Sequence, residues 1–226
     1  MLISAPSIPC RAAKSRVTFP TMITTSGLLT QFPSDTARAL ADYRHRIFVQ
    51  RLGWHLPCLD GREFDQFDRP DTVYTLALDA SGAILGCARM LPTTKPYLLG
   101  ELFPELLDGA PPPRSARIWE LSRFACSSPS ATRPLLAATI ASAARAGATR
   151  LLTISPLGVE RLMRRMGVQM RRAGAPIRMH GKQVLACWID IDAQTRSSLE
   201  IGRSATLRAE RSPACVGTHE GEHYDA

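Results

Sequence analysis

The second half of the chain alternates strand-like and helix-like segments, and this order limits the possible folds more than any other feature of the sequence. Short apolar runs predict strands, and the longer segments between them, with apolar residues at helical spacing, predict helices. From residue 115 onward we expect, in order, strand 115–126, helix 128–147, strand 149–155, helix 156–167, strand 168–173 and strand 182–191. A strand, a helix and a second strand in succession form a crossover, which places two strands of one sheet parallel.

The first half of the chain predicts a different kind of connection. Residues 33–53 have apolar side chains at helical spacing after Ser34, a residue type that often caps helices. Residues 73–91 hold two apolar runs around a turn containing Gly82, which predicts a β-hairpin, and residues 92–113 predict a loop with one short helix. A hairpin combined with a crossover predicts an α/β fold, a three-layer α-β-α sandwich whose twisted mixed sheet carries helices on both faces.

Length and cysteine usage indicate a single intracellular domain. The 226 residues suffice for one substantial domain, which we expect over 22–200, with a disordered extension over 1–21 and a loose tail over 201–226. No apolar run approaches the roughly 18 residues that a membrane span needs, and no signal peptide is recognisable. The scattered cysteines favour neither a disulfide framework nor a zinc site, so a reducing cytoplasm is the expected location. They are Cys10, Cys58, Cys87, Cys126, Cys187 and Cys215.

Positive charge is concentrated in one part of the sequence. Between Arg133 and Lys182 there are ten basic residues and a single acid, Glu160, while the whole chain has a net charge of +8. Such a field suits an acidic macromolecule, either nucleic acid or protein, although a solvated basic surface has the same composition. The stretch contains no aromatic residue for stacking on bases, and no helix-turn-helix or zinc-finger signature is present.

Negative charge is concentrated in a much shorter stretch. Residues 63–71, EFDQFDRPD, place four carboxylates among nine residues, with Phe64 and Phe67 between them. Aromatic residues favour burial, and buried carboxylates require positive charge nearby. That charge could come from arginines of the protein itself, from a metal or from a cationic substrate.

Four strings carry a more specific resemblance. RHRIFVQRLGW (44–54), FDQFD (64–68), CARML (87–91) and WELSRF (119–124) occur in the order and spacing of one family. Over about residues 22–192 the chain resembles the acyl-homoserine-lactone synthases, the bacterial LuxI-type autoinducer synthases, and its element order resembles the acetyltransferase-like (GNAT) fold. The resemblance implies acyl transfer from acyl carrier protein to S-adenosylmethionine, giving a quorum-sensing N-acyl-homoserine lactone, methylthioadenosine and free carrier protein. No metal or redox cofactor is implied.

The resemblance also implies which residues form the site. Glu120, Ser122 and Arg123 are the expected catalytic residues. The expected pocket for S-adenosylmethionine contains Arg44, Phe48, Trp54, Asp65, Asp68 and Arg89. The substrate presents an ammonium, a carboxylate and a sulfonium. The two aspartates suit the ammonium, Arg44 suits the carboxylate, and the two aromatic faces suit the sulfonium or adenine.

Each assignment has a purely structural alternative. Phe48 and Trp54 could simply pack in the core, and the two aspartates could form an internal ion-pair cluster with Arg89 and Arg123. We expect both interpretations of the aspartates to hold in part, in a charge network that includes Glu120 and that substrate completes. Glu120 is the expected proton acceptor, because an α-ammonium with a pKa near about 8 must lose a proton before its nitrogen attacks a thioester. Its alternative role is as the salt-bridge partner of Arg123.

The spacing within WELSRF makes a geometric prediction. In a regular strand Glu120 and Arg123 point to opposite faces of the sheet. If both serve one site, we expect a bulge or bend near residues 121–123, which would also free a backbone N–H to stabilise a tetrahedral oxyanion.

The acyl donor accounts for the basic half of the chain in this interpretation. Acyl carrier proteins are acidic, so we expect a docking face formed by Arg150, Arg161, Arg164, Arg165, Arg171 and Arg172. Thr153 lies where a threonine of the family accompanies 3-oxo-acyl chains, so it is the candidate residue of the acyl-chain pocket.

Two other functions remain open from the residues alone. The first is an acetyl-coenzyme A-dependent N-acetyltransferase. Its usual glycine-rich pyrophosphate loop would fall at CSSPSATRP (126–134), which contains no glycine. The second is a non-enzymatic nucleic-acid-binding protein, which would explain the basic region but leaves the acidic and aromatic motifs unexplained.

Overall fold

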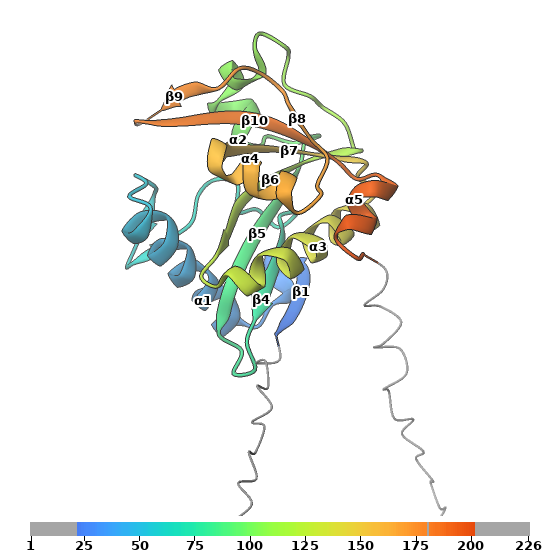
Figure 1. Ribbon diagram of the computed structural model, residues 1–226. Coiled ribbons are helices and arrows are strands. Elements are labelled where there is room, and N and C mark those ends of the chain that lie inside the picture. The colour runs from blue at the N-terminus through green and yellow to red at the C-terminus, as the bar shows by residue number, and fades with distance from the viewer. Residues whose placement is uncertain (1–21, 180, 202–226) are drawn as a thin grey trace, which may run out of the picture.

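The computed structural model describes residues 22–179 and 181–201; the expectations for 1–21 and 202–226 lie outside these residues. Its main sheet has the strand order β1-β4-β5-β6-β7-β10-β8, and β9 pairs with β10 (Figure 1). The strands are β1 Ile23–Leu28, β4 Val73–Leu78, β5 Ile84–Pro92, β6 Ile118–Cys126, β7 Arg150–Pro156, β8 Met170–Arg172, β9 Ile177–Met179 and β10 Lys182–Asp190. A small second sheet pairs β2 Cys58–Leu59 with β3 Arg62–Glu63.

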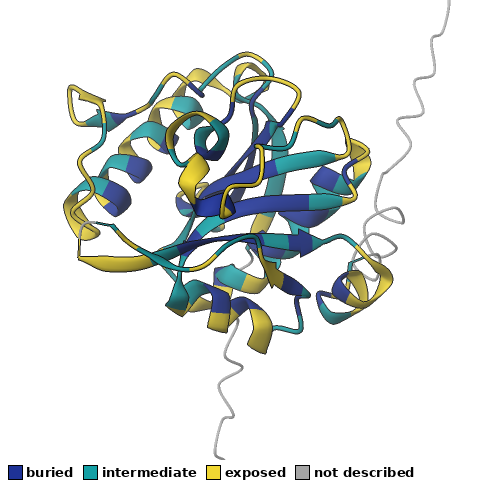
Figure 2. Ribbon diagram, turned by 90° about the horizontal axis from the view of Figure 1, so that it is seen from above, coloured by how far each residue is buried: buried dark blue, intermediate teal, exposed yellow. Residues whose placement is uncertain are grey.

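Helices cover both faces of the main sheet. They are α1 Ser34–Arg44, α2 Leu98–Leu102, α3 Pro129–Arg145, α4 Leu157–Arg165 and α5 Ala193–Ser198, with a π-helix η2 His45–Arg51 and 3-10 helices η1 Leu29–Gln31 and η3 Pro104–Leu107. α3 and α4 pack on one face through a core that includes Leu136, Leu151 and Met163. α1 and η2 pack on the other face through Leu40 and Phe48. Figure 2 shows the buried strands between helices whose outer surfaces are exposed.

The two parallel strands separate part of the way along the sheet. β6 and β7 pair in parallel from Ile118 with Arg150 to Leu121 with Thr153, where their pairing ends. Beyond this point β6 continues beside β5, and β7 continues beside β10. The sheet therefore forks directly after Leu121 and Thr153.

The expected three-layer arrangement is confirmed, and each predicted strand has a counterpart in the sheet. The prediction of a single helix over 33–53 is wrong in detail, because α1 ends at Arg44 and a seven-residue π-helix begins at His45. The loop over 92–113 contains two short helices, α2 and η3, instead of one. β1, the β2–β3 pair, β9 and α5 were not predicted. Among the described helices, none is both long and apolar enough to cross a membrane.

Candidate active site

Three arginines and three carboxylates form a buried charge network on the α1 face of the sheet. Each of the six side chains is no more than 7% exposed. Arg44 comes from the end of α1, Arg89 from β5 and Arg123 from β6. The carboxylates all come from the acidic stretch at the end of β3 and just after it; they are Glu63, Asp65 and Asp68.

Arg44 joins two of the carboxylates. Its Nε donates to Glu63 Oε2 at 2.6 Å, and its Nη1 donates to Asp68 Oδ1 at 2.9 Å and to the Tyr74 hydroxyl at 2.7 Å. Its Nη2 is buried and has no hydrogen-bond partner within the described part of the chain. Because a buried guanidinium donor without an acceptor is costly, this atom is the open position of the network.

Arg89 and Arg123 complete the connections. Arg89 donates to both oxygens of Asp65 at 2.6 and 3.1 Å and to Asp68 at 2.9 Å. Arg123 Nη2 bridges Glu63 and Asp65, at 2.9 Å to each. The internal ion-pair cluster anticipated for the aspartates is therefore present.

The two aspartates of the network each accept four hydrogen bonds from the protein. Asp65 accepts from Arg89, from Arg123 and from the backbone N–H of Phe67. Asp68 accepts from Arg44, from Arg89, from the Tyr74 hydroxyl and from the backbone N–H of Asp65. A carboxylate offers about four lone-pair sites, two on each oxygen, so Asp65 is fully used by the protein, whereas Asp68 accepts three hydrogen bonds at Oδ1 and only one at Oδ2.

The arginines determine the protonation of this network. Burial alone would raise the pKa of Asp68, but Arg44 and Arg89 more than offset it and hold that pKa well below its usual range. Burial likewise opposes ionisation of Glu63, yet its hydrogen bonds from Arg44 and Arg123 lower its pKa. These two carboxylates therefore stay ionised at neutral pH.

Glu120 is in a different environment on the same face. Its carboxylate is fully buried and accepts two backbone hydrogen bonds, from Leu98 N–H at 2.9 Å and from Leu99 N–H at 2.8 Å. Burial raises the pKa of Glu120 to about 7, an effect that these N–H groups and the more distant Arg89 and Arg123 only partly oppose. The expectation that Glu120 belongs to the network is corrected, because within the described residues its hydrogen bonds come only from Leu98 and Leu99, and these are also not the contacts of the alternative role as salt-bridge partner of Arg123.

The bulge expected in β6 is confirmed. Cys87 pairs with Ala125 and Arg89 pairs with Ser122, so one residue of β5 faces two residues of β6. Arg123, inside this bulge, has φ = 50°, in the left-handed region that residues with side chains seldom adopt. The extra residue brings Arg123 to the face of the sheet that holds Glu63 and Asp65.

The remaining residues expected in the site are distributed around the network. Ser122 accepts a hydrogen bond from Arg89 Nε at 3.1 Å. Phe48 is buried in the core, as its structural alternative stated, and stacks on Trp54 with ring centroids 5.0 Å apart. The Arg123 guanidinium lies 5.6 Å from the centre of the Phe48 ring, and Trp54 remains 36% exposed.

Sequence reasoning missed two members of this site. Glu63 belongs to the acidic stretch but was not singled out, although it is fully buried between Arg44 and Arg123. Tyr74 accepts a hydrogen bond from Arg44 and donates one to Asp68. The density of acids in EFDQFDRPD could have indicated Glu63, whereas Tyr74 is indistinguishable from an ordinary strand residue.

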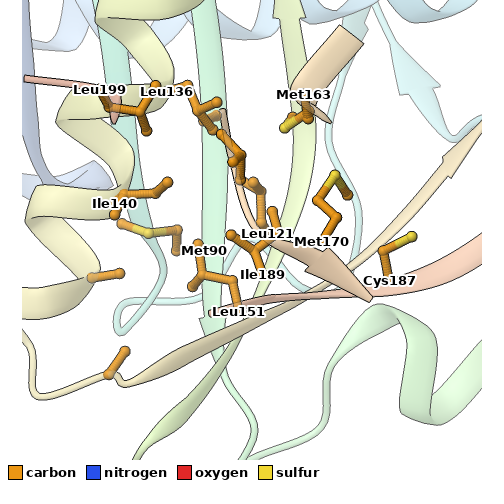
Figure 3. Packing of buried hydrophobic residues seen from close by; sticks show 14 of the residues in the cluster. Met90, Leu121, Leu136, Ile140, Leu151, Met163, Met170, Cys187, Ile189 and Leu199 are labelled. Atoms are coloured by element: carbon orange, nitrogen blue, oxygen red, sulfur yellow. The ribbon is translucent and has the colours of Figure 1, made fainter. Parts of the chain in front are cut away.

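Thr153 lies on the other face of the sheet. Its pairing partners Leu121 and Cys187 both belong to the core beneath α3 and α4. Figure 3 shows this core, in which Met90, Met163 and other apolar side chains meet. Thr153 is therefore at the fork of the sheet but on the opposite face from Glu120.

The six arginines expected to form one docking face are divided between two faces of the sheet. Arg164 and Arg172 both bind Glu160 of α4, whereas Arg150 and Arg171 both bind Asp190 at the end of β10. Arg150 also lies 5.3 Å from the ring of Trp188, which packs with the core beneath α2. The expectation of a single six-arginine face is therefore wrong.

A pocket of about 470 Å³ opens beside α4. It is lined by Arg51, Cys126, Ser127, Pro129, Thr132, Arg133, Leu162 and Met166. These residues bring together the end of η2, the start of α3 and the outer side of α4. The glycine-free CSSPSATRP segment thus forms one wall of a pocket with two arginines.

Comparison with known proteins agrees with this geometry. The family model described as "Autoinducer synthase" matches residues 33–199. An acyl-homoserine-lactone synthase from Ralstonia nicotianae is 51% identical over 184 residues, covering 76% of this chain and 90% of that protein. An acyl-homoserine-lactone synthase from Acinetobacter nosocomialis is 45% identical over 179 residues, covering 74% of this chain and 98% of that protein.

Solved structures give the same result. TofI, in a ternary complex with an inhibitor and MTA, is 50% identical with a TM-score of 0.73, covering 80% of this chain and 98% of that chain. BjaI, described as a CoA-dependent acyl-homoserine lactone synthase with SAM and isopentyl-CoA, is 28% identical with a TM-score of 0.74, covering 80% and 88%. A putative N-acetyltransferase from Lactobacillus plantarum, 18% identical with a TM-score of 0.55 and covering 76% and 99%, shares the fold, which confirms the GNAT-like prediction.

Proposed function

The chain belongs to the acyl-homoserine-lactone synthase family, and from this premise we propose how its residues divide the reaction and which acyl donor they accept. It is an acyltransferase that makes a quorum-sensing signal from S-adenosylmethionine. Family membership replaces both the acetyltransferase and the nucleic-acid-binding alternatives. The roles of individual residues and the source of the acyl chain are the parts that we propose.

Arg44 binds the carboxylate of S-adenosylmethionine in this proposal. The unpaired Nη2 of Arg44 is buried beside the network and needs an acceptor. The orientation of this donor is fixed, because Nε and Nη1 of the same guanidinium are bonded to Glu63 and Asp68. A carboxylate satisfies the open donor, and charge assistance makes that bond strong.

Asp65 and Asp68 act by holding arginines in place. Each aspartate already binds two arginines, Asp65 with Arg89 and Arg123 and Asp68 with Arg44 and Arg89, so the negative charge of both is compensated within the protein. We therefore assign the ammonium to Glu120, the carboxylate of this site that no arginine binds directly. The open face of Trp54, stacked on Phe48, suits the sulfonium or the adenine.

Acyl transfer begins with loss of one proton from the ammonium to Glu120. The free amine then attacks the thioester carbonyl, the C–S bond of the thioester breaks, and the carrier leaves as its thiol. A backbone N–H at the bulge around Arg123 is the proposed donor to the intermediate oxyanion, because a bulge interrupts the regular pairing of the strand. Ring closure follows when the substrate carboxylate attacks its own γ-carbon and displaces methylthioadenosine, a step that depends mainly on the folded conformation of the substrate.

The acyl chain extends into the core beneath α3 and α4. Leu121 and Thr153 form the last parallel pair before the sheet forks, so a chain entering the fork passes between the two sheet halves beside them. Met90, Met163 and Met170 line this core, and methionine adapts readily to different shapes. Thr153 is the candidate polar contact within this apolar region.

We propose acyl carrier protein as the donor in preference to coenzyme A. A coenzyme A pyrophosphate needs several converging donors, commonly backbone N–H groups at a helix start. Here the Ser127 N–H is bonded to Leu85 O, Pro129 has no N–H, and the Ala131 N–H is bonded to Ser128 O. The single phosphate of a carrier prosthetic group requires fewer donors, and Arg51 with Arg133 can supply them.

The outer side of α4 is the proposed docking surface for the carrier. In the described part of the chain, Arg161 and Arg165 form no ion pair, and Leu162 between them is 43% exposed. Leu162 also lines the pocket proposed for the phosphate, so docking on α4 places the prosthetic group at its entrance. Arg150 and Arg171 are left out of this surface because Asp190 already binds both.

One observation supports this proposal most strongly: Glu120 has a raised pKa, and backbone N–H groups, not arginines, bind its carboxylate. The test is mass spectrometry of purified protein with S-adenosylmethionine and either acyl carrier proteins or acyl-coenzyme A, for wild type and Glu120→Gln. We expect equal amounts of acyl-homoserine lactone and methylthioadenosine from the carrier-bound donor, and a loss of about 10²- to 10⁴-fold in the variant. Faster turnover of acyl-coenzyme A would reject the proposed donor, and full activity of Glu120→Gln would reject the proposed base.

A further inference from the structure

Gly100 and Tyr97 hold the backbone that binds Glu120. The N–H groups of Leu98 and Leu99 supply the two hydrogen bonds to the Glu120 carboxylate, and both residues lie between Tyr97 and Gly100 in the chain. The direction of these N–H groups depends on how residues 97–100 turn.

Hydrogen bonds hold Tyr97 both at its side-chain hydroxyl and at its backbone carbonyl. Its hydroxyl donates to Pro113 O at 3.0 Å, and the residue is 3% exposed. Its backbone carbonyl accepts from Glu101 N–H at 3.0 Å, which closes the first turn of α2. The ring therefore has little freedom to move aside.

Gly100 lies directly against this ring. A Cβ at position 100 would come within 2.7 Å of Tyr97 Cζ and 2.9 Å of its Cε1, closer than real Cβ contacts. Because the ring is anchored through its hydroxyl, the strain would pass to the backbone of Leu98 and Leu99. The packing thus requires glycine here although its backbone conformation does not, since Gly100 is not among the positive-φ glycines.

We propose that Gly100 and Tyr97 are positioning residues for the proton-accepting carboxylate, acting through the two backbone N–H groups that they align. Neither residue contacts the reacting atoms in this role. The inference rests on the proposed function of Glu120 and adds the mechanism that sets its basicity.

The remaining charges around Glu120 stay constant when this contact is changed. Arg89 faces it from β5, Arg123 faces it from β6, and the Tyr97 hydroxyl is neutral because burial raises its pKa to about 12. Loss of N–H hydrogen bonds weakens the ionised form of a carboxylate, so the pKa of Glu120 moves upward. As a base it then requires a higher pH to be ionised.

The test compares kcat–pH profiles of wild type, Gly100→Ala, Tyr97→Leu and the double variant. We expect Gly100→Ala to move the acid limb up by about one pH unit, which is a rate loss of about tenfold below both pKa values. Tyr97→Leu removes the ring, so adding Gly100→Ala to it should cause no further movement of the limb. Gly27→Ala in β1 is the matched control, because a Cβ at position 27 would also come close, at 2.9 Å, but only to the end of the exposed Gln31 side chain, far from α2 in the chain.

The outcomes separate this inference from the function beneath it. If the wild-type limb near pH 7 is lost in Glu120→Gln but is unchanged in Gly100→Ala, the positioning role is wrong and the base assignment stands. If Glu120→Gln keeps the wild-type limb, the base assignment itself is wrong. A Gly100→Ala effect that persists undiminished in the Tyr97→Leu background also overturns the inference, because the ring would then not transmit it.

Discussion

The arginine–carboxylate network and Glu120 lie on the same face of the sheet, and Glu63 of the network is as fully buried as Glu120, yet the network carboxylates and Glu120 hold their protons differently. Arg44 and Arg89 lower the pKa of Asp68, whereas Glu120, held only by two backbone N–H groups, has its pKa raised to about 7. The comparison shows that the donor type, and not burial, separates a carboxylate that fixes structure from one that can accept a proton. We expect disruption of the network to lower stability, and disruption of Glu120 to lower the rate while relieving a loss of stability at higher pH.

The largest effect on stability is expected from Asp68→Ala. The substitution leaves Arg44 and Arg89 buried with one partner fewer, and breaking such a pair costs about 3–5 kcal/mol. Chemical denaturation measures the free energy of unfolding. Asp35→Ala is the control, because Asp35 pairs with Arg38 on the exposed surface, where the loss is about 0–1 kcal/mol. Equal losses in the two variants would mean that the network does not support the fold.

Glu120→Gln should have a pH-dependent effect on stability, opposite in sign to the loss expected for Asp68→Ala. The folded-state pKa of Glu120 is raised to about 7, so the folded protein holds a proton there that the unfolded chain releases from about pH 4.5 upward. Wild type therefore loses stability as the pH rises from about 5 to 8, by up to about 3 kcal/mol, and the variant lacks this loss. Denaturation at pH 5 and pH 8 measures the difference in unfolding free energy between Glu120→Gln and wild type. As the pH rises, this difference should change in favour of the variant. A difference that does not change with pH would contradict the raised pKa.

The two arginine surfaces should differ in their effect on donor recognition. Arg161→Ala with Arg165→Ala removes free charge from α4, and we expect the KM for acyl carrier protein to rise about tenfold and to lose salt dependence. Arg150→Ala with Arg171→Ala removes the same number of charges, but from side chains that bind Asp190 and lie away from α4, so the KM should hardly change. Steady-state kinetics at two salt concentrations measure both. A larger effect of the second pair would place the carrier on the opposite face of the sheet.

The smallest effect is expected from Tyr74→Phe. The change removes one hydroxyl from a network in which Asp68 keeps Arg44, Arg89 and a backbone N–H as donors. A loss of about 1 kcal/mol in unfolding free energy is expected, together with a modest rise in the KM for S-adenosylmethionine. A loss as large as that of Asp68→Ala would show that the hydroxyl, and not the arginines, holds Asp68.

The sequence predicted the layers of the fold because hydrophobic period and glycine placement are local signals. The same signals fail for β1, whose sequence ITTSGL is polar and lies at the sheet edge, and for η2, whose π-helical turns follow α1 without any change in composition. The bulge at Arg123 could be predicted, since two residues three apart in a strand can share a face only through an extra residue.

The site was predictable only in part, for a similar reason. Charged side chains stand out in a sequence, but the partners of Glu120 are backbone N–H groups, which any residue can provide. The division of the arginines was present in the sequence and overlooked: Arg171 and Arg172 are adjacent in a strand and therefore point to opposite faces.

The pH dependence of kcat for wild type and Glu120→Gln, at saturating S-adenosylmethionine and acyl carrier protein between pH 5 and 9, tests the central claim most directly. The wild-type rate should fall on the acid side with an apparent pKa of about 7, the value expected for Glu120. The residual rate of the variant should lack this limb. An acid limb near pH 7 that persists in Glu120→Gln would contradict the claim and assign the proton to another group.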